Sequence, residues 1–126
     1  MPIDVAKHVA YWRTGAREDM ETAQFLLERD KRREVLFFAH LALEKALKAL
    51  IVKTTHDLAP LSYNLVLLAE KTGLGLPEPD RVFFVDMNRF SLHGRYPDPD
   101  RPLPDRREAE EHVRRAEETL KWLTQR

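Results

Sequence analysis

The sequence has no cysteine and only four glycines among its 126 residues. The absence of cysteine excludes disulfide bonds, thiolate metal sites and cysteine nucleophiles, and it suits the reducing cytoplasm in which we expect the protein. The few glycines form no phosphate-binding loop, and no serine or threonine lies in a nucleophile motif. The sequence therefore does not indicate a self-sufficient nucleotide-hydrolysing enzyme.

Neither sign of charge is in excess, because 21 lysines and arginines balance 21 aspartates and glutamates. Proteins that bind nucleic acid through a broad field of phosphate contacts usually carry a clear positive excess. Any contact with nucleic acid is therefore expected to be local. The five histidines do not have the spacing of metal ligands, so we expect neither a metal site nor a cofactor.

The sequence also lacks an apolar run of the length of a signal peptide or a membrane span. The longest apolar stretch, around residues 35–52, is interrupted by four polar side chains, namely His40, Glu44, Lys45 and Lys48. No segment alternates with the period of a strand. Apolar residues recur instead at spacings of three and four, which predicts helices over residues 5–29, 34–53, 63–71, 80–92 and 105–123.

These helices predict an all-α fold, a single domain over residues 1–126 built as an up-and-down bundle of four to five helices. The charged turn at residues 29–34 is short, so the first two helices form a long antiparallel pair. The second helix is apolar over most of its circumference and is expected at the centre. Ser62 is the predicted N-cap of the short third helix, Gly73 its C′ residue, and Asp105 the N-cap of the last helix.

Arg89 and His93 form the first candidate site. They are four residues apart, so both project from the same face of the fourth helix if it reaches His93. An arginine can hold a phosphate and a histidine can move a proton near neutral pH, which is a minimal set of groups for cutting RNA without a metal. The same residues also suit the end of any helix, where they bind free carbonyls. Whether the chain is an enzyme stays open on spacing alone.

The segment that follows, Arg95-Tyr96-Pro97-Asp98, is the second candidate. Pro97 restricts Tyr96 to extended conformations and presents its ring rigidly. Tyr96 can then stack on a base while Arg95 binds a phosphate. Alternatively, Asp98 pairs with Arg95 and closes a turn, which explains the segment as a corner between helices without any ligand.

The third candidate lies on the central helix. Glu44 and Lys48 form an i, i+4 pair in the favourable order, Lys45 is adjacent, and His40 precedes Glu44 by one turn. These residues form either a solvated stripe or a partly buried polar seam at which a ligand or another chain docks.

Three blocks of the sequence resemble the HEPN domain (higher eukaryotes and prokaryotes nucleotide-binding) in order and spacing. The closest branch is the small prokaryotic one that is paired with minimal nucleotidyltransferases. The blocks are FFAHLALEKALKALI at 37–51, LAPLSYNLVLLAEKTGL at 58–74 and RYPD at 95–98. The resemblance covers about residues 10–125.

The resemblance implies a homodimer with its interface near the RYPD segment. It also implies a nucleotide-related role beside a nucleotidyltransferase, often as one half of a toxin–antitoxin pair. The expected nucleotide- or RNA-phosphate-binding residues are Arg95, Tyr96, Asp98, Lys45 and Lys48.

Many HEPN domains are metal-independent RNases with an Arg-x(4–6)-His motif. Here only three residues separate Arg89 from His93, one fewer than the motif requires. A binding module is therefore the first hypothesis. An RNase that uses Arg89 and His93 across the dimer interface is the second, and a purely structural helical scaffold is the third. No membrane partner is expected.

Overall fold

The computed structural model describes residues 2–96 and 98–126, and the expected restriction of Tyr96 by Pro97 falls outside this part of the chain. The all-α prediction is confirmed, since no strand occurs among the described residues. The helices are α1 (Val5–Glu28), α2 (Arg32–Thr55), α3 (Leu65–Lys71), α4 (Glu78–His93) and α5 (Arg106–Thr124).

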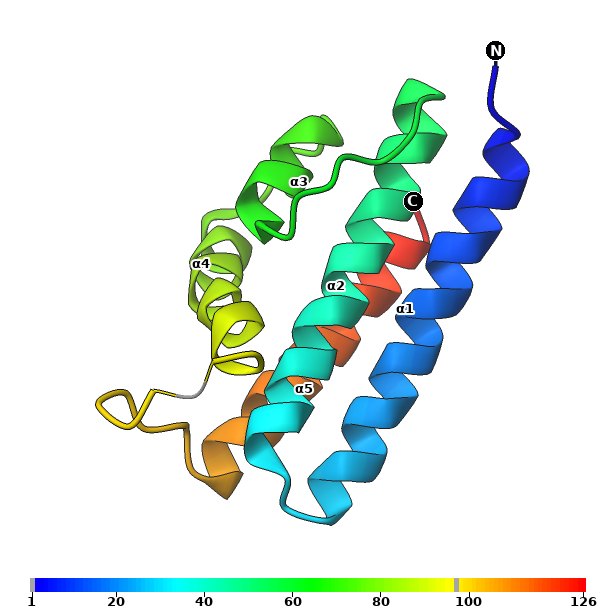
Figure 1. The fold of residues 1–126 in the computed structure, drawn as a ribbon. Coiled ribbons are helices and arrows are strands. Elements are labelled where there is room, and N and C mark those ends of the chain that lie inside the picture. The colour runs from blue at the N-terminus through cyan, green and yellow to red at the C-terminus, as the bar shows by residue number, and fades with distance from the viewer. Residues whose placement is uncertain (1, 97) are drawn as a thin grey trace.

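The long antiparallel pair is formed by α1 and α2, as predicted (Figure 1). Helix α2 contacts each of the other four helices, which confirms its central position. Its alanine ridge is buried (Ala39, Ala42, Ala46 and Ala49), and the buried residues of α1 include two further alanines, Ala16 and Ala23. Small side chains on both helices let the two backbones approach closely. None of the described helices is both long and apolar enough to cross a membrane.

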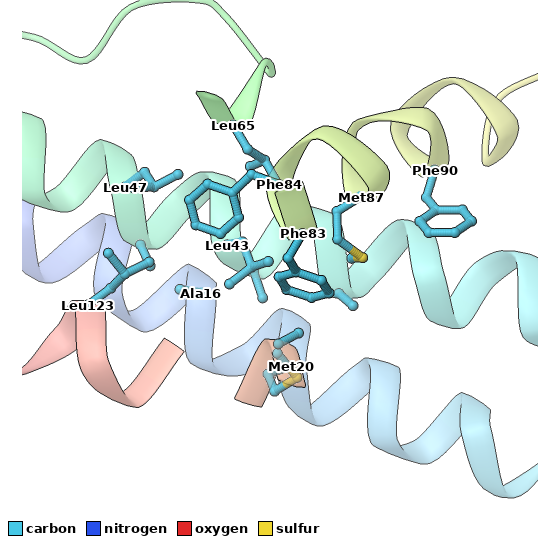
Figure 2. Close-up of a cluster of buried hydrophobic side chains, with 14 of the residues drawn as sticks. Ala16, Met20, Leu43, Leu47, Leu65, Phe83, Phe84, Met87, Phe90 and Leu123 are labelled. Carbon is cyan, nitrogen blue, oxygen red and sulfur yellow. The ribbon is translucent and has the colours of Figure 1, made fainter. Parts of the chain in front are cut away.

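Helix α4 covers another side of α2 with large apolar side chains. Phe84, Met87 and Phe90 of α4 are fully or almost fully buried and lie in one cluster with Leu43 and Leu47 of α2 (Figure 2). Burying such side chains supplies roughly 1.5–3 kcal/mol each relative to exposure. This packing holds the carboxyl end of α4, where the candidate residues lie, firmly against the bundle.

The predicted cap of the third helix was wrong. Helix α3 begins at Leu65, and its N-cap is Asn64, whose Oδ1 accepts from the backbone N–H groups of Val66 at 3.1 Å and Leu67 at 3.4 Å. Ser62 instead accepts the backbone N–H of Asn64 at 3.1 Å. Both residue types are good N-caps, so local chemistry did not choose between them. Gly73 has the predicted positive φ, +77°, and Asp105 caps α5 as predicted.

Helix α4 begins at Glu78, before the predicted start at Asp80, and ends at His93. Pro79 lies in the first turn of this helix, where a missing N–H removes no intrahelical bond, so the helix can begin before Asp80. The helix thus includes His93, so Arg89 and His93 do stand one turn apart on one helix.

Candidate functional site

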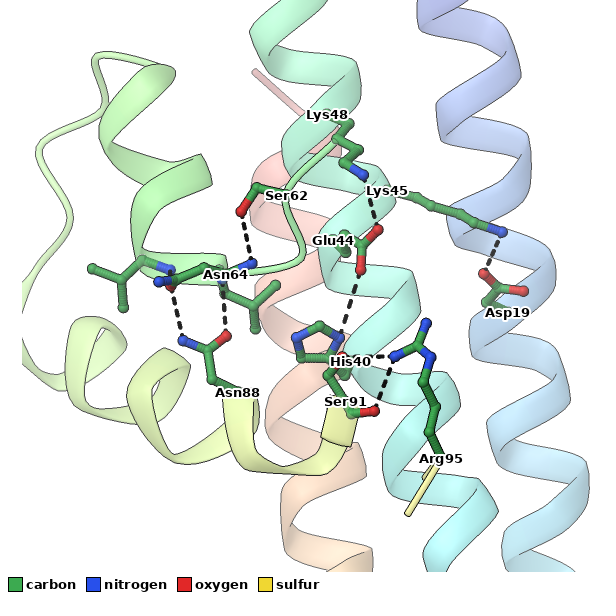
Figure 3. A network of polar contacts seen from close by, with 12 residues as sticks. Asp19, His40, Glu44, Lys45, Lys48, Ser62, Asn64, Asn88, Ser91 and Arg95 are labelled. Atoms are coloured by element: carbon green, nitrogen blue, oxygen red, sulfur yellow. Dashed lines mark hydrogen bonds and ion pairs between the residues drawn. The ribbon is translucent and has the colours of Figure 1, made fainter. Parts of the chain in front are cut away.

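Arg95 holds the corner that follows α4 against the rest of the bundle. Its Nη1 donates to the backbone oxygen of Ser91 at 3.0 Å and to the Ser91 hydroxyl at 3.1 Å (Figure 3). The guanidinium carbon lies 5.0 Å from the ring centroid of Phe37 and 5.6 Å from that of Tyr63, which is cation–π range. Arg95 therefore joins α4 to α2 and to the segment before α3.

Tyr96 and Asp98 lie beyond this anchor and face solvent. The Tyr96 residue is 69% exposed, so its ring is available to stack on a base. Asp98 pairs with Arg101 rather than Arg95, at 3.9 Å from its Nε, and it accepts the backbone N–H of Asp100 at 2.9 Å. The Asp98 carboxylate thus closes the turn formed by the residues that follow it in the chain.

The residues His40, Glu44 and Lys48 form a buried polar seam along α2 and not a solvated stripe. Lys48 Nζ lies 2.9 Å from Glu44 Oε2, and both residues are buried. The same ammonium lies 5.3 Å from the ring centroid of Trp12 on α1. Lys48 is therefore held inside the molecule by a carboxylate and an aromatic ring, and a ligand can reach it only if this packing opens.

His40 is completely buried at one end of the seam (Figure 3). Its Nδ1 lies 3.8 Å from Glu44 Oε1, and neither ring nitrogen makes a well-formed hydrogen bond with the described residues. Burial lowers the pKa of His40 from 6.5 to about 4, because desolvation disfavours the imidazolium; Asn88 and the backbone of Tyr63 oppose the shift. His40 is accordingly neutral at physiological pH.

Lys45 points away from this seam and toward α1. Its Nζ lies 2.7 Å from Asp19 Oδ2 (Figure 3). A Cβ on Gly15 would come within 3.0 Å of the Lys45 Cδ, so the glycine leaves room for the lysine side chain to pass. Lys45 and Lys48, predicted together as phosphate ligands, thus pair with carboxylates in different places.

Arg89 and His93 have different surroundings, although one helix carries both. Arg89 Nε lies 3.1 Å from Asp86 Oδ1, and Asp86 Oδ2 lies 2.8 Å from Nε2 of His112 on α5. His93 is only 5% exposed, and its ring packs edge-on against Phe90 with 6.5 Å between centroids. It lines a cavity of about 290 Å³ together with residues of the 98–103 linker and Arg33 of α2.

The outward face of α4 carries an exposed apolar stripe. Val82, Val85 and Leu92 are 59%, 56% and 57% exposed, and Arg89 lies in the same row. The spacings of three, four and three residues place all four side chains on one face of the helix. Such a row at a helix surface is typical of a contact with another helix.

Sequence reasoning missed several residues that shape these sites. Asn88 links α4 to the start of α3, since its Oδ1 accepts the Leu65 N–H at 2.9 Å and its Nδ2 donates to Asn64 at 2.9 Å. His112, one of the five histidines without the spacing of metal ligands, binds Asp86 of α4. No spacing in the sequence marks such pairs, because each joins residues from different helices.

A family model supplies the decisive comparison. The model of the HEPN domain matches residues 9–126, which is nearly the whole chain. The chain belongs to the HEPN domain family. This HEPN chain matches no curated protein sequence.

Two solved structures share the fold of this HEPN domain. TT1696 from Thermus thermophilus superposes with a TM-score of 0.79 at 23% identity, over 93% of this chain and 96% of that one. ST0689, described as an archaeal HEPN homologue, gives 0.73 at 20% identity, over 92% and 94% of the two chains. At these identities the likeness establishes the shared helical fold.

Proposed function

We propose that this HEPN domain is a nucleotide- or RNA-phosphate-binding module that acts as a homodimer beside a minimal nucleotidyltransferase, in the manner of a toxin–antitoxin pair. The proposal rests above all on the exposed stripe of α4, in which Arg89 lies among Val82, Val85 and Leu92. A second copy packed on this stripe would cover the apolar side chains and bring two Arg89 side chains together.

Such a dimer supplies positive charge locally in a chain whose net charge is zero. The contact of Arg89 with Asp86 uses Nε, so the terminal nitrogens of the guanidinium keep donors for a phosphate. Tyr96, exposed just beyond the end of α4, adds a ring on which a base can stack. A local cluster of this kind binds a nucleotide or a short stretch of backbone rather than a long duplex.

Light scattering on the purified chain tests the homodimer. We expect a dimer at high micromolar concentration for the wild type and a monomer for Val85→Glu, which places a charge in the stripe. Phe25→Glu, at another exposed apolar residue on α1, is the matched control and should remain dimeric. A wild-type chain that stays strictly monomeric would contradict the homodimer and any site shared between subunits.

The partner is tested through the neighbouring gene. A minimal nucleotidyltransferase encoded beside this chain should co-purify with it when the two are expressed together. An unrelated neighbour, or a nucleotidyltransferase that elutes separately at micromolar concentrations of both, would oppose this part of the proposal.

A metal-independent RNase is the second candidate function. It is favoured by the position of Arg89 and His93 on one helix, with His93 lining a cavity. In this mechanism His93 would move a proton at the 2′-hydroxyl or the leaving oxygen while an arginine stabilises charge on the phosphate.

A further inference from the structure

Helices α4 and α5 are joined by polar side chains rather than by a close approach of their backbones. Within the described residues, α5 packs on α1 and α2 while α4 packs on α2 and α3, and the backbones of α4 and α5 do not meet. Two side chains of α5 reach α4 instead. Arg115 Nη2 donates to the Pro79 backbone oxygen at 2.9 Å, and His112 Nε2 lies 2.8 Å from Asp86 Oδ2. The second of these links ends three residues before Arg89 on α4.

The Asp86 carboxylate is shared between His112 and Arg89. Its Oδ2 faces His112 Nε2 at 2.8 Å, and its Oδ1 lies 3.1 Å from Arg89 Nε. The other ring nitrogen of His112, Nδ1, lies 2.7 Å from the Glu108 backbone oxygen. A carboxylate and a carbonyl oxygen both accept, so the ring makes the two hydrogen bonds together in its doubly protonated form. Asp86 thus offers one oxygen to each of two cations.

Aromatic packing also holds the ring of His112 in place. Its centroid lies 6.2 Å from that of Phe83 and 5.5 Å from that of Phe90, two side chains of α4 (Figure 2). The guanidinium carbon of Arg89 lies 4.5 Å from the centroid of the same Phe90 ring. Phe90 is itself buried in the core. The hydrogen bond to Glu108 and the two rings therefore fix the direction in which His112 Nε2 points.

Arg89 keeps the outer end of its guanidinium free. Its Nε is buried, whereas the side chain as a whole is 39% exposed. Within the part of the chain that the structure describes, Nη1 and Nη2 have no hydrogen-bond partner and are not among the buried atoms. A carboxylate frequently binds a guanidinium through both of its oxygens. Asp86 does not bind Arg89 in this way, because its second oxygen faces His112.

We propose that His112 is a positioning residue that keeps the terminal nitrogens of Arg89 available for a phosphate. By holding Asp86 Oδ2, it leaves Arg89 a single carboxylate contact at Nε. Without this hydrogen bond, the Asp86 side chain can turn and bind Arg89 through both oxygens. The donors that a phosphate needs would then be used within α4. The inference deepens the proposed function and rests on it, because it concerns how Arg89 is kept ready for its ligand.

Binding of a fluorescent single-stranded RNA decamer, measured by fluorescence anisotropy, tests this role. His112→Phe keeps an aromatic ring beside Phe83 and Phe90 but lacks the donor to Asp86. It should weaken binding about tenfold, the order expected when a hydrogen bond to a charged group is lost. His8→Phe, at a partly exposed histidine on α1, is the matched control and should bind like the wild type. His112→Ala replaces His112→Phe if circular dichroism shows that the phenylalanine disturbs the fold.

A second substitution separates positioning from a merely structural role. The double variant His112→Phe, Asp86→Asn should bind the decamer at least as tightly as the wild type, because a neutral amide does not compete with a phosphate for the Arg89 guanidinium. If His112 only supported the fold, removing Asp86 as well would not restore affinity. Weak binding by the double variant, with unchanged circular dichroism, would therefore contradict the positioning role.

The side-chain ¹H–¹⁵N signals of Arg89, assigned with Arg89→Gln, give a readout that needs no RNA. In the wild type the terminal groups should give one averaged signal. In His112→Phe, binding of both Asp86 oxygens should slow their rotation and separate the signals. Averaged signals and wild-type affinity in His112→Phe would overturn the positioning role and leave the proposed function standing. If the wild type bound no RNA, the proposed function would lose this ligand, and the Arg89 signals would still decide whether His112 positions Arg89.

Discussion

The ring of Phe37 lies directly against the backbone of Gly94. A Cβ built on Gly94 would come within 2.4 Å of Phe37 Cδ2, a distance that real Cβ atoms do not show. Gly94 has φ −64°, so its backbone is open to any residue and only the close approach requires glycine. This contact brings the corner after α4 onto α2, where Arg95 then stacks on the same ring.

The first prediction concerns that contact. Gly94→Ala should destabilise the fold by about 1–3 kcal/mol, because the added methyl group forces Phe37 or the corner to move. Urea unfolding measures the change. Gly75→Ala is the matched control, since nothing lies within 4 Å of a Cβ there. Equal free energies of unfolding for the two variants would mean that Phe37 can move aside without destabilising the fold.

The second prediction concerns acid stability. His40 has a pKa of about 4 in the folded chain against 6.5 when unfolded, so the unfolded state binds more protons between these values. The contribution of His40 to the free energy of unfolding is complete above pH 6.5. It falls by about 3 kcal/mol as the pH drops to 4. Unfolding free energies at pH 7, 6, 5 and 4 check this. The unfolding free energy of His40→Gln should fall less steeply with decreasing pH than that of the wild type. If both fall equally steeply, the loss belongs to other titratable groups.

The third prediction concerns the buried ion pair. Lys48→Met leaves the Glu44 carboxylate buried without its cation and should cost about 3–5 kcal/mol. The double variant Glu44→Gln, Lys48→Met should recover much of this loss, because no uncompensated charge remains. A double-mutant cycle by urea unfolding measures the coupling. Additive effects would contradict the pairing.

The fourth prediction separates a binding corner from a structural scaffold. Arg95→Ala removes the contacts with Ser91 and the stacking on Phe37 and Tyr63, and should lower stability by about 1–3 kcal/mol. If the corner binds phosphate, RNA affinity should also fall when measured well below the melting temperature. Unchanged affinity in fully folded protein would favour the scaffold hypothesis for Arg95.

The fifth prediction concerns catalysis. If the chain is a metal-independent RNase, the wild type should cleave single-stranded RNA in EDTA, and His93→Ala should lower the rate at least about 100-fold, the usual contribution of general acid–base catalysis. Gel analysis of labelled RNA measures both rates. Equal rates for the two proteins would assign the cleavage to a contaminating nuclease.

The short Arg89–His93 spacing illustrates how far sequence reasoning reached. The spacing predicted that both residues share a face of one helix, and α4 does carry both. It did not indicate that Arg89 contacts Asp86, which in turn binds His112, or that His93 is enclosed by the linker and Arg33. Asp86 is on α4 itself, whereas His112, the linker residues and Arg33 come from other elements, so their positions depend on how the elements pack.

The helix ends show the same difference between features that adjacent residues determine and features that depend on packing. Asp105 and Gly73 were predicted correctly because their roles depend on a few adjacent residues. The choice of Asn64 over Ser62 was missed; Asn88 of α4 donates to Asn64 and so supports the cap that forms. A local pattern offered two acceptable caps, and the tertiary fold decided between them.

The sequence by itself determined the helices, their antiparallel pairing, the central place of α2 and the family, because repeat spacings and short motifs express geometry within one or two turns. Only the tertiary structure decided which charged side chains are buried. Lys48 is held inside by Glu44 and Trp12, while Arg33 and Arg101 line the same cavity as His93. The physical reason is that burial and long-range pairing depend on the packing of whole elements, which no local spacing encodes.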